Sequence, residues 1–258
     1  MHDWNPSLYR RFEDERTRPA AELLARVAIE APRLVFDLGC GPGNSTQLLV
    51  ERYAQAEVVG IDNSPAMLAA ARQRLPGTRF ESGDVRNWQP QPTPDLVYAN
   101  ASLQWIPDHE RLLPRLFASL SSGGVLAVQM PDNLEEASHR LMRETAAEPR
   151  FASFVDDATA PRARILSAQH YYDLLAPAAA DIDIWRTTYH HRMASAADIV
   201  QWLRSTGLRP FVEALPQALH AQFLQAYEGR IAEAYPECTD GSRLLAFPRL
   251  FIVARRKS

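Results

Sequence analysis

The chain of 258 residues is long enough for one large α/β domain or for two small ones. Hydrophobic residues make up 46% of it and charged residues 23%, as in an ordinary soluble globular protein. A net charge of −3 gives no basic surface for nucleic acid or an anionic membrane, and no apolar run is long enough to span a membrane. We therefore expect no nucleic-acid, membrane or obligate protein partner.

Two further features bear on the cellular location. The first twenty residues contain arginines but no apolar stretch, so we expect no signal peptide. The two cysteines, Cys40 and Cys238, lie far apart in the sequence, which is typical of a reducing compartment with neither a disulfide nor a cysteine metal site. We expect a cytoplasmic protein without a bound metal.

Residues 1–30 are expected to form helices. The segment Trp4–Ser7 is typical of a helix start, with a proline at an early position. Pro19 is predicted to open a second helix, whose buried face contains Leu23, Leu24 and Val27. These helices precede the first predicted strand.

Between residues 34 and 130, short apolar runs alternate with segments of helical periodicity. We expect strands over Leu34–Asp37, Glu57–Ile61, Thr78–Glu81, Asp95–Ala99 and Val125–Met130, with helices that end near Tyr53, open at Ser64-Pro65 and span Glu110–Leu120. Strands that alternate with helices predict a Rossmann-like α/β fold, in which a doubly wound and mostly parallel sheet has right-handed crossovers.

The second half of the chain is less regular. We expect helices over 133–147, Ala168–Leu175, Ser195–Thr206 and Pro216–Tyr235, strands over Asp181–Tyr189 and Leu244–Ala254, and a loop or lid over 148–166. The last two strands are predicted to complete a seven-stranded sheet as its antiparallel edge. Pro248 should impose a bulge or delay the start of the last strand, because proline is poorly tolerated inside a central strand.

The domain organisation follows from these elements. The helices between the last two strands have no place in the minimal fold. We expect 1–258 to form a single domain, with the helices of 1–30 and 190–240 as a cap over the carboxyl ends of the strands.

A glycine-rich loop follows the first predicted strand, where Asp37 precedes Gly39, Gly41 and Gly43. Glycine at every second position indicates a loop whose backbone closely approaches a ligand. The loop lacks the lysine of a phosphate-binding loop, and its G-x-G-x-G spacing differs from the dinucleotide fingerprint. An acid before the loop suits a ligand that carries an ammonium group. We expect Asn44 or Ser45 to cap the helix that follows.

The run from Asp37 to Gly43, D-L-G-C-G-P-G, resembles the first motif of class I S-adenosylmethionine (SAM)-dependent methyltransferases. In this fold the ligand lies across the carboxyl ends of the strands. We expect the ammonium of SAM at Asp37, its ribose at Asp62 and its adenine near Met67 and Asp84. The full set of expected donor-binding residues is Asp37, Gly39, Gly41, Gly43, Asp62, Met67, Asp84, Val85, Asn100, Ser102 and Gln104.

A narrower resemblance runs nearly from end to end of the chain. Segments such as Glu15–Ala20, Asn100–Trp105, Gln129–Asn133, Ile184–Tyr189 and Leu245–Leu250 are similar to the trans-aconitate 2-methyltransferase family. This resemblance implies that the methyl group of SAM is transferred to a carboxylate of trans-aconitate, which gives the monomethyl ester and S-adenosylhomocysteine.

Three alternatives stay open from the residues alone. The chain could be a methyltransferase for another small acid, a carrier-bound carboxylate or a ring carbon. It could also be a binding module without catalysis. The third alternative, a nicotinamide dehydrogenase, is disfavoured by the glycine spacing.

A tricarboxylate acceptor requires cationic side chains, and arginine binds a carboxylate through two parallel hydrogen bonds. Arg18 and Arg209 are favoured, because each is followed by proline in a segment that matches the family. The expected acceptor site comprises Tyr9, Arg16, Arg18, Trp105, His170, Tyr172, Arg192, Arg209 and Arg249, with Tyr171 and Tyr189 as further wall residues. We expect no catalytic general base, since a carboxylic acid with a pKa of about 4 is already ionised at neutral pH.

Overall fold

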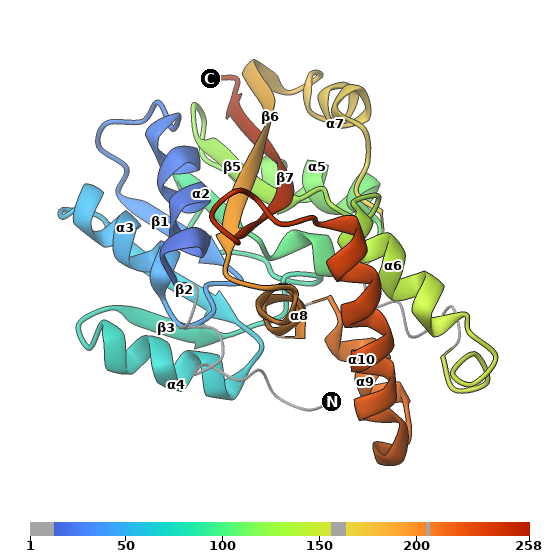
Figure 1. The fold of residues 1–258 in the computed structure, drawn as a ribbon. Helices are drawn as coiled ribbons and strands as arrows, with labels where there is room; N and C mark the ends of the chain where they lie inside the picture. Colours follow the sequence, from blue (N-terminus) through green and yellow to red (C-terminus); the bar gives the residue numbers. More distant parts are fainter. Residues whose placement is uncertain (1–12, 156–163, 205–206) are drawn as a thin grey trace. The chain divides into compact units, whose positions relative to one another are not determined.

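The computed structural model describes residues 13–155, 164–204 and 207–258, with side chains described from residue 17 onward (Figure 1). A seven-stranded sheet has the order β3-β2-β1-β4-β5-β7-β6. Its strands are β1 (Leu34–Leu38), β2 (Glu57–Asp62), β3 (Arg79–Ser82), β4 (Leu96–Asn100), β5 (Val125–Pro131), β6 (Ala179–Met193) and β7 (Arg243–Arg256). The first five strands are parallel and the last two form the antiparallel edge, which confirms the predicted fold class.

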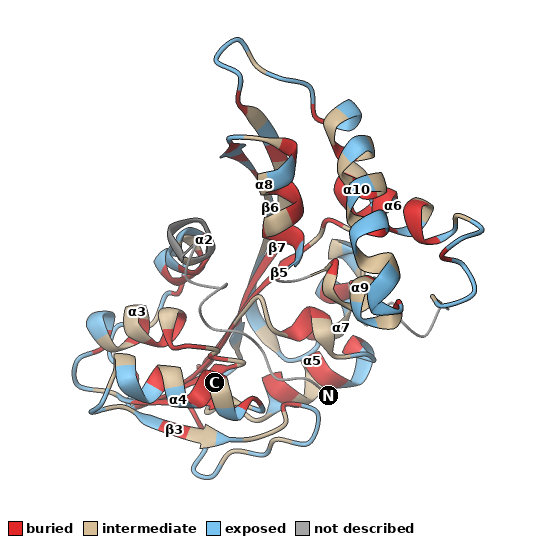
Figure 2. Ribbon diagram, turned by 60° about the horizontal axis from the view of Figure 1, so that its bottom comes forward, coloured by how far each residue is buried: buried red, intermediate tan, exposed pale blue. Residues whose placement is uncertain are grey.

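The central strands are buried because helices cover both faces of the sheet (Figure 2). All five residues of β1 and all seven of β5 are buried, as expected for parallel strands enclosed on both sides. The helices are α2 (Glu13–Ala25), α3 (Asn44–Arg52) and α4 (Pro65–Arg74) on one face, and α5 (His109–Ala118) and α7 (Ala168–Leu175) on the other. Alternate residues of the strands, such as Phe36 and Val97, form one core with α5 and α7.

The described chain divides into two compact units. One unit contains the chain up to Pro131, Ile165–Arg186 and Leu250–Ser258, and it includes the five parallel strands. The other contains Asp132–Arg164 and Thr187–Arg249. Its helices are α6 (Ala137–Ala146), α8 (Ala196–Arg204), α9 (Arg209–Ala214) and α10 (Gln217–Ala234).

In the second unit, α10 packs against α6 and α8. The Phe151 and Phe223 rings meet edge to face, with their centroids 5.2 Å apart. The hydroxyl of Tyr227 donates to the carbonyl of Ser138 at 2.8 Å. This unit therefore has a packed core of its own.

Several boundaries agree with the sequence. Ser64 caps α4, where its Oγ accepts the backbone N–H of Met67 at 3.2 Å and Pro65 follows as the first helical residue. Helix α7 has the predicted bounds, and Leu23, Leu24 and Val27 are buried as predicted. None of the described helices combines the length and apolarity needed to cross a membrane.

Three local predictions were wrong. Pro19 lies inside α2 and does not open a new helix. Gly43, in place of Asn44 or Ser45, is the N-cap of α3. Strand β7 begins at Arg243 and contains Pro248, so the proline does not delay its start. In addition, helix α9 was not predicted from the sequence.

Candidate functional site

The strand order reverses between β1 and β4, because β1 pairs with β2 on one side and with β4 on the other. In an open α/β sheet, this reversal creates a crevice at the carboxyl ends of the strands. The glycine loop follows β1 at this edge, and the segment after β4 begins at Ala101. The crevice is thus bordered by the residues expected to bind the donor.

The three glycines of the loop share a backbone conformation that favours glycine, but their surroundings differ. All have positive φ, of 71° at Gly39, 52° at Gly41 and 89° at Gly43. A Cβ on Gly39 would lie 2.2 Å from the Cβ of Ser102, and one on Gly43 would lie 3.4 Å from Ala71. A Cβ on Gly41 would have no heavy atom of the described residues within 4 Å. Gly41 is therefore the position at which the backbone is open to a ligand.

Asp37 is a fully buried carboxylate. Its Oδ2 accepts the hydroxyls of Ser45 and Thr46, each at 2.7 Å, whereas its Oδ1 has no hydrogen-bond partner among the described residues. Burial raises the pKa of Asp37 to about 6, against the lowering effect of the two hydroxyls. A buried carboxylate with one free oxygen is costly without a partner and favours a cationic ligand such as an ammonium group.

Asp62, the last residue of β2, holds the glycine loop. Its Oδ2 accepts the N–H of Gly41 at 2.9 Å, and its Oδ1 accepts the N–H of Ser64 at 2.9 Å. Its carboxylate is partly exposed at the carboxyl end of β2, and carboxylate oxygens accept hydrogen bonds from hydroxyl groups. This geometry fits a pair of ribose hydroxyls.

The residues expected near the adenine differ in their burial and in their hydrogen bonds. Met67 is only 4% exposed on the first turns of α4, and Val85 is also buried. The carboxylate of Asp84 accepts the Nε of Arg86 at 2.8 Å and its backbone N–H at 2.9 Å. These bonds lower the pKa of Asp84. An adenine amino group would therefore share Asp84 with Arg86.

The segment after β4 presents two more acceptors. The side-chain oxygens of Asn100 and Gln104 are buried without a hydrogen-bond partner among the described residues. The amide nitrogen of Gln104 donates to the carbonyl of Ala101 at 2.7 Å, and the hydroxyl of Ser102 donates to the carbonyl of Leu38 at 2.6 Å. Together with Oδ1 of Asp37, these acceptor oxygens are available for the hydrogen-bond donors of a ligand.

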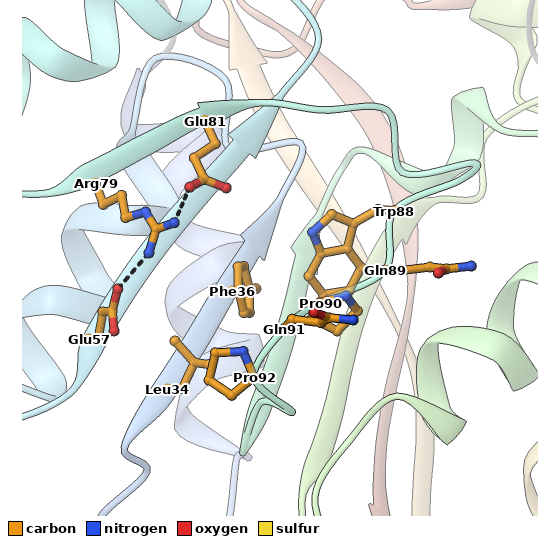
Figure 3. Close-up of a pocket in the computed structure, with 10 residues that line it drawn as sticks. All are labelled: Leu34, Phe36, Glu57, Arg79, Glu81, Trp88, Gln89, Pro90, Gln91 and Pro92. Carbon is orange, nitrogen blue, oxygen red and sulfur yellow. Dashed lines mark hydrogen bonds and ion pairs between the residues drawn. The ribbon is translucent and has the colours of Figure 1, made fainter.

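A separate cavity of about 280 Å³ lies away from this edge (Figure 3). Its floor is formed by Leu34 and Phe36, from the face of β1 beneath the segment that links β3 to β4. Trp88 packs edge to face on Phe36 at 4.9 Å, and Arg79 pairs with Glu57 beside it. The cavity contains none of the predicted donor-binding residues.

Comparison with known proteins identifies the family. A family model described as a methyltransferase domain matches residues 35–124. The chain is 62% identical over 259 residues to the trans-aconitate 2-methyltransferase of Variovorax paradoxus (strain S110), with 100% of both chains covered. It is 63% identical over 260 residues to the protein of the same name from Methylobacterium radiotolerans, again with 100% of both chains covered. The chain belongs to the trans-aconitate 2-methyltransferase family.

Membership of this family makes the protein a SAM-dependent methyltransferase. The fold agrees with the solved structure of the YcgJ protein from Bacillus subtilis, at a TM-score of 0.60 and 12% identity, covering 93% of this chain and 99% of that one. The protein thus combines the fold expected from its sequence with membership of a SAM-dependent family.

The acceptor candidates of the first unit lie on three elements. Arg18 on α2 pairs with Glu22 at 2.9 Å, and its side chain is 68% exposed. Trp105 is half-buried in the short 3₁₀ turn Leu103–Trp105. His170 on α7 lies 3.2 Å from a carboxylate oxygen of Glu110, and Tyr172 is exposed. Tyr9 and the side chain of Arg16 lie outside the described residues.

The remaining candidates belong to the second unit. Arg192 pairs with Asp240 at 2.9 Å and is 70% exposed. Arg209 pairs with Glu213 at 2.7 Å, with 21% of its side chain exposed. Arg249 is the most buried, at 3% exposed, and its guanidinium lies over the rings of Phe247 and Tyr189 at 4.8 and 5.9 Å. The three arginines therefore differ strongly in exposure, and Arg249 has the guanidinium that its neighbours hold most firmly.

Two groups of residues at the site were missed from the sequence. Ser45 and Thr46 hold Asp37, although Ser45 was expected only to cap a helix. The sequence did contain a signal for this role. Two adjacent hydroxyl residues follow the glycine loop in the first turn of the next helix, and an acid precedes the loop. His109 forms a buried contact with Tyr171 beside the segment after β4, and no sequence pattern pointed to His109. Tyr171 was expected as a wall residue of the acceptor site, but its side chain is fully buried.

Proposed function

We propose that this protein transfers the methyl group of SAM to a carboxylate of trans-aconitate, which gives the monomethyl ester and S-adenosylhomocysteine, in the cytoplasm. The observation that carries this proposal is the similarity over the whole chain to relatives named trans-aconitate 2-methyltransferase, at 62–63% identity. The unpaired acceptors at the carboxyl ends of β1 and β4 support the choice of donor.

The donor site is assigned residue by residue. Asp37 binds the ammonium group through its free Oδ1, and Asp62 accepts the ribose hydroxyls. Gly41 lets the methionine part lie against the backbone, because no side chain intervenes. When bound, SAM supplies a methyl group on a positively charged sulfur, which leaves as a neutral thioether.

The reaction requires no side chain to act as an acid, a base or a nucleophile. The acceptor carboxylate is ionised at neutral pH and is already a nucleophile, so no side chain needs to remove a proton. The protein must hold the carboxylate in line with the methyl group and remove its water, and such positioning contributes up to about 7–11 kcal/mol in favourable cases.

We further propose that two arginines of the second unit, Arg249 and Arg209, bind the acceptor. Arg249 is the strongest candidate, because burial and the rings of Phe247 and Tyr189 hold its guanidinium in a fixed orientation. Arg209 is the second, since its side chain is half-buried and pairs with Glu213. Arginine at both positions would bind the two carboxylates that are not methylated.

The test is direct. The purified protein is incubated with labelled SAM and a panel of di- and tricarboxylic acids, and products are identified by mass spectrometry. The proposal predicts that trans-aconitate gives the highest kcat/KM and a monomethyl ester. A different preferred acid, or methylation only of a carrier-bound carboxylate, would overturn the choice of acceptor and leave the donor assignment intact.

A further inference from the structure

A chain of hydrogen bonds crosses the first unit beside the donor crevice. His109, the first residue of α5, is buried with both ring nitrogens engaged. Its Nε2 lies 2.9 Å from the carbonyl oxygen of Leu103, and its Nδ1 lies 2.6 Å from the hydroxyl of Tyr171. The hydroxyl of Tyr171 also accepts the backbone N–H of Leu166 at 3.1 Å. The chain thus connects the segment after β4 with α7.

Burial lowers the pKa of His109 and favours its neutral ring. For the neutral ring, the direction of every bond in this chain follows. A carbonyl oxygen only accepts, so the proton of the ring is on Nε2 of His109. Nδ1 is then an acceptor, and the hydroxyl of Tyr171 donates to it. The same hydroxyl accepts from Leu166.

The segment that His109 holds is conformationally unfavourable. Ala101 has φ 53° and Asp108 has φ 61°, and these are the two non-glycine residues with positive φ in the described part of the chain. They stand at the two ends of the segment, and such backbone conformations cost about 1–3 kcal/mol each. Interactions from outside must therefore hold the segment in place.

The same segment carries side chains of the donor and acceptor sites. Gln104 has its free acceptor oxygen here, and Trp105 is an expected acceptor-site residue. The carbonyl of Leu103 accepts two hydrogen bonds, from Ile106 N–H and from Nε2 of His109, each at 2.9 Å. His109 is the side chain that fixes Leu103 directly before these two residues.

We propose that His109 and Tyr171 are positioning residues, which hold the segment Ala101–Asp108 so that Gln104 and Trp105 face the reactants. Neither residue is assigned a contact with a substrate. The inference rests on the proposed function, because it concerns the site at which donor and acceptor meet.

The first test compares two matched variants. Tyr171→Phe removes one hydroxyl from a fully buried ring, and Tyr227→Phe removes the same group from an equally buried ring of the second unit, where it donates to Ser138. Both should lose stability, and Tyr171→Phe should lose more, because its hydroxyl makes two hydrogen bonds. Tyr171→Phe should also lower kcat/KM for the acceptor about fivefold or more, since even one lost hydrogen bond has an effect of that size, and weaken SAM binding in calorimetry without acceptor. Tyr227→Phe should leave both nearly unchanged.

The second test uses His109. His109→Leu removes both bonds at similar volume, whereas the amide of His109→Gln restores a donor toward Leu103. We expect kcat and SAM affinity to fall in the leucine variant and to recover partly in the glutamine variant. In the wild-type protein, nitrogen-15 NMR should show a neutral His109 ring protonated at Nε2.

Three outcomes would overturn the inference. These are equal kinetics and SAM affinity for Tyr171→Phe and Tyr227→Phe, no recovery in His109→Gln, and a proton on Nδ1 of His109 in the wild-type protein. Failure of the proposed acceptor is seen separately, as a wild-type protein that binds SAM but does not methylate trans-aconitate. SAM affinity and NMR would still test the positioning role in that case.

Discussion

Replacing Asp37 with asparagine removes a buried charge at nearly constant shape. The carbonyl oxygen of asparagine can still accept the hydroxyls of Ser45 and Thr46. The uncharged side chain avoids the desolvation free energy of a buried carboxylate, and it no longer attracts an ammonium group. The variant should therefore be more stable than the wild-type protein and unable to bind SAM tightly.

The size of the effect follows from the pKa of Asp37, which rises from an ordinary 3.8 to about 6 on folding. Between these values the folded state binds more protons than the unfolded state, so the free energy of unfolding falls as the pH rises. Each pKa unit corresponds to about 1.4 kcal/mol, which gives about 3 kcal/mol at pH 8 as an upper bound for Asp37→Asn. The gain should shrink to about half near pH 5.

The assay is urea unfolding without SAM at pH 8 and pH 5, together with calorimetry of SAM binding at pH 8. We expect a more stable variant whose affinity for SAM is at least about tenfold weaker. Asp62→Asn is the control. In the wild-type protein, each carboxylate oxygen of Asp62 accepts a backbone N–H. The amide nitrogen of asparagine cannot accept, so the variant loses one of these two bonds in either orientation. It should lose stability. A less stable Asp37→Asn, or a gain that does not depend on pH, would refute the account.

Four further predictions concern binding and rate. Gly41→Ala should abolish SAM binding in a folded protein, whereas Gly123→Ala, with φ 73° and open space around its Cβ among the described residues, should bear the same backbone strain and keep SAM affinity. Asp62→Ala should raise KM for SAM about tenfold, the effect of a lost hydrogen bond to a charged group, and should change KM for trans-aconitate little. A rise in KM for trans-aconitate instead would show that Asp62 is misassigned. Arg249→Ala and Arg209→Ala should raise KM for trans-aconitate more than for SAM, with partial rescue by lysine, and unchanged kinetics in both would exclude them. With both substrates saturating, turnover should stay flat from about pH 6.5 to 9, while the SAM affinity falls as Asp37 is protonated below about pH 6; a tenfold rise with pH that disappears on replacing one histidine would indicate a general base.

The sequence alone determined the parallel sheet and the place of the donor loop. Apolar runs bounded by turn residues predict buried strands, because a strand enclosed on both faces excludes polar side chains. The loop from Gly39 to Gly43 marks the crevice, since close backbone packing and positive φ both require glycine. The Ser64 cap was also readable, because capping depends on neighbours within four residues.

Local rules for proline were wrong where residues distant in the sequence hold the backbone around it. Pro19 lies within α2, where Ala20 is buried and its carbonyl accepts the hydroxyl of Tyr98 from β4 at 2.6 Å. Pro248 lies within β7, where its carbonyl accepts the N–H of Asp132 at 2.9 Å. A proline rule considers only the missing N–H and cannot include partners more than seventy residues away.

Only the tertiary structure decided the surroundings of each candidate site residue. The spacing of the glycines is regular, but Ser102 excludes a side chain at Gly39, whereas Gly41 faces open space among the described residues. Burial, which the sequence does not record, raised the pKa of Asp37 and distinguished Arg249 from the exposed Arg18. Hydrogen bonds and desolvation depend on distances between residues far apart in the chain, and the fold alone sets those distances.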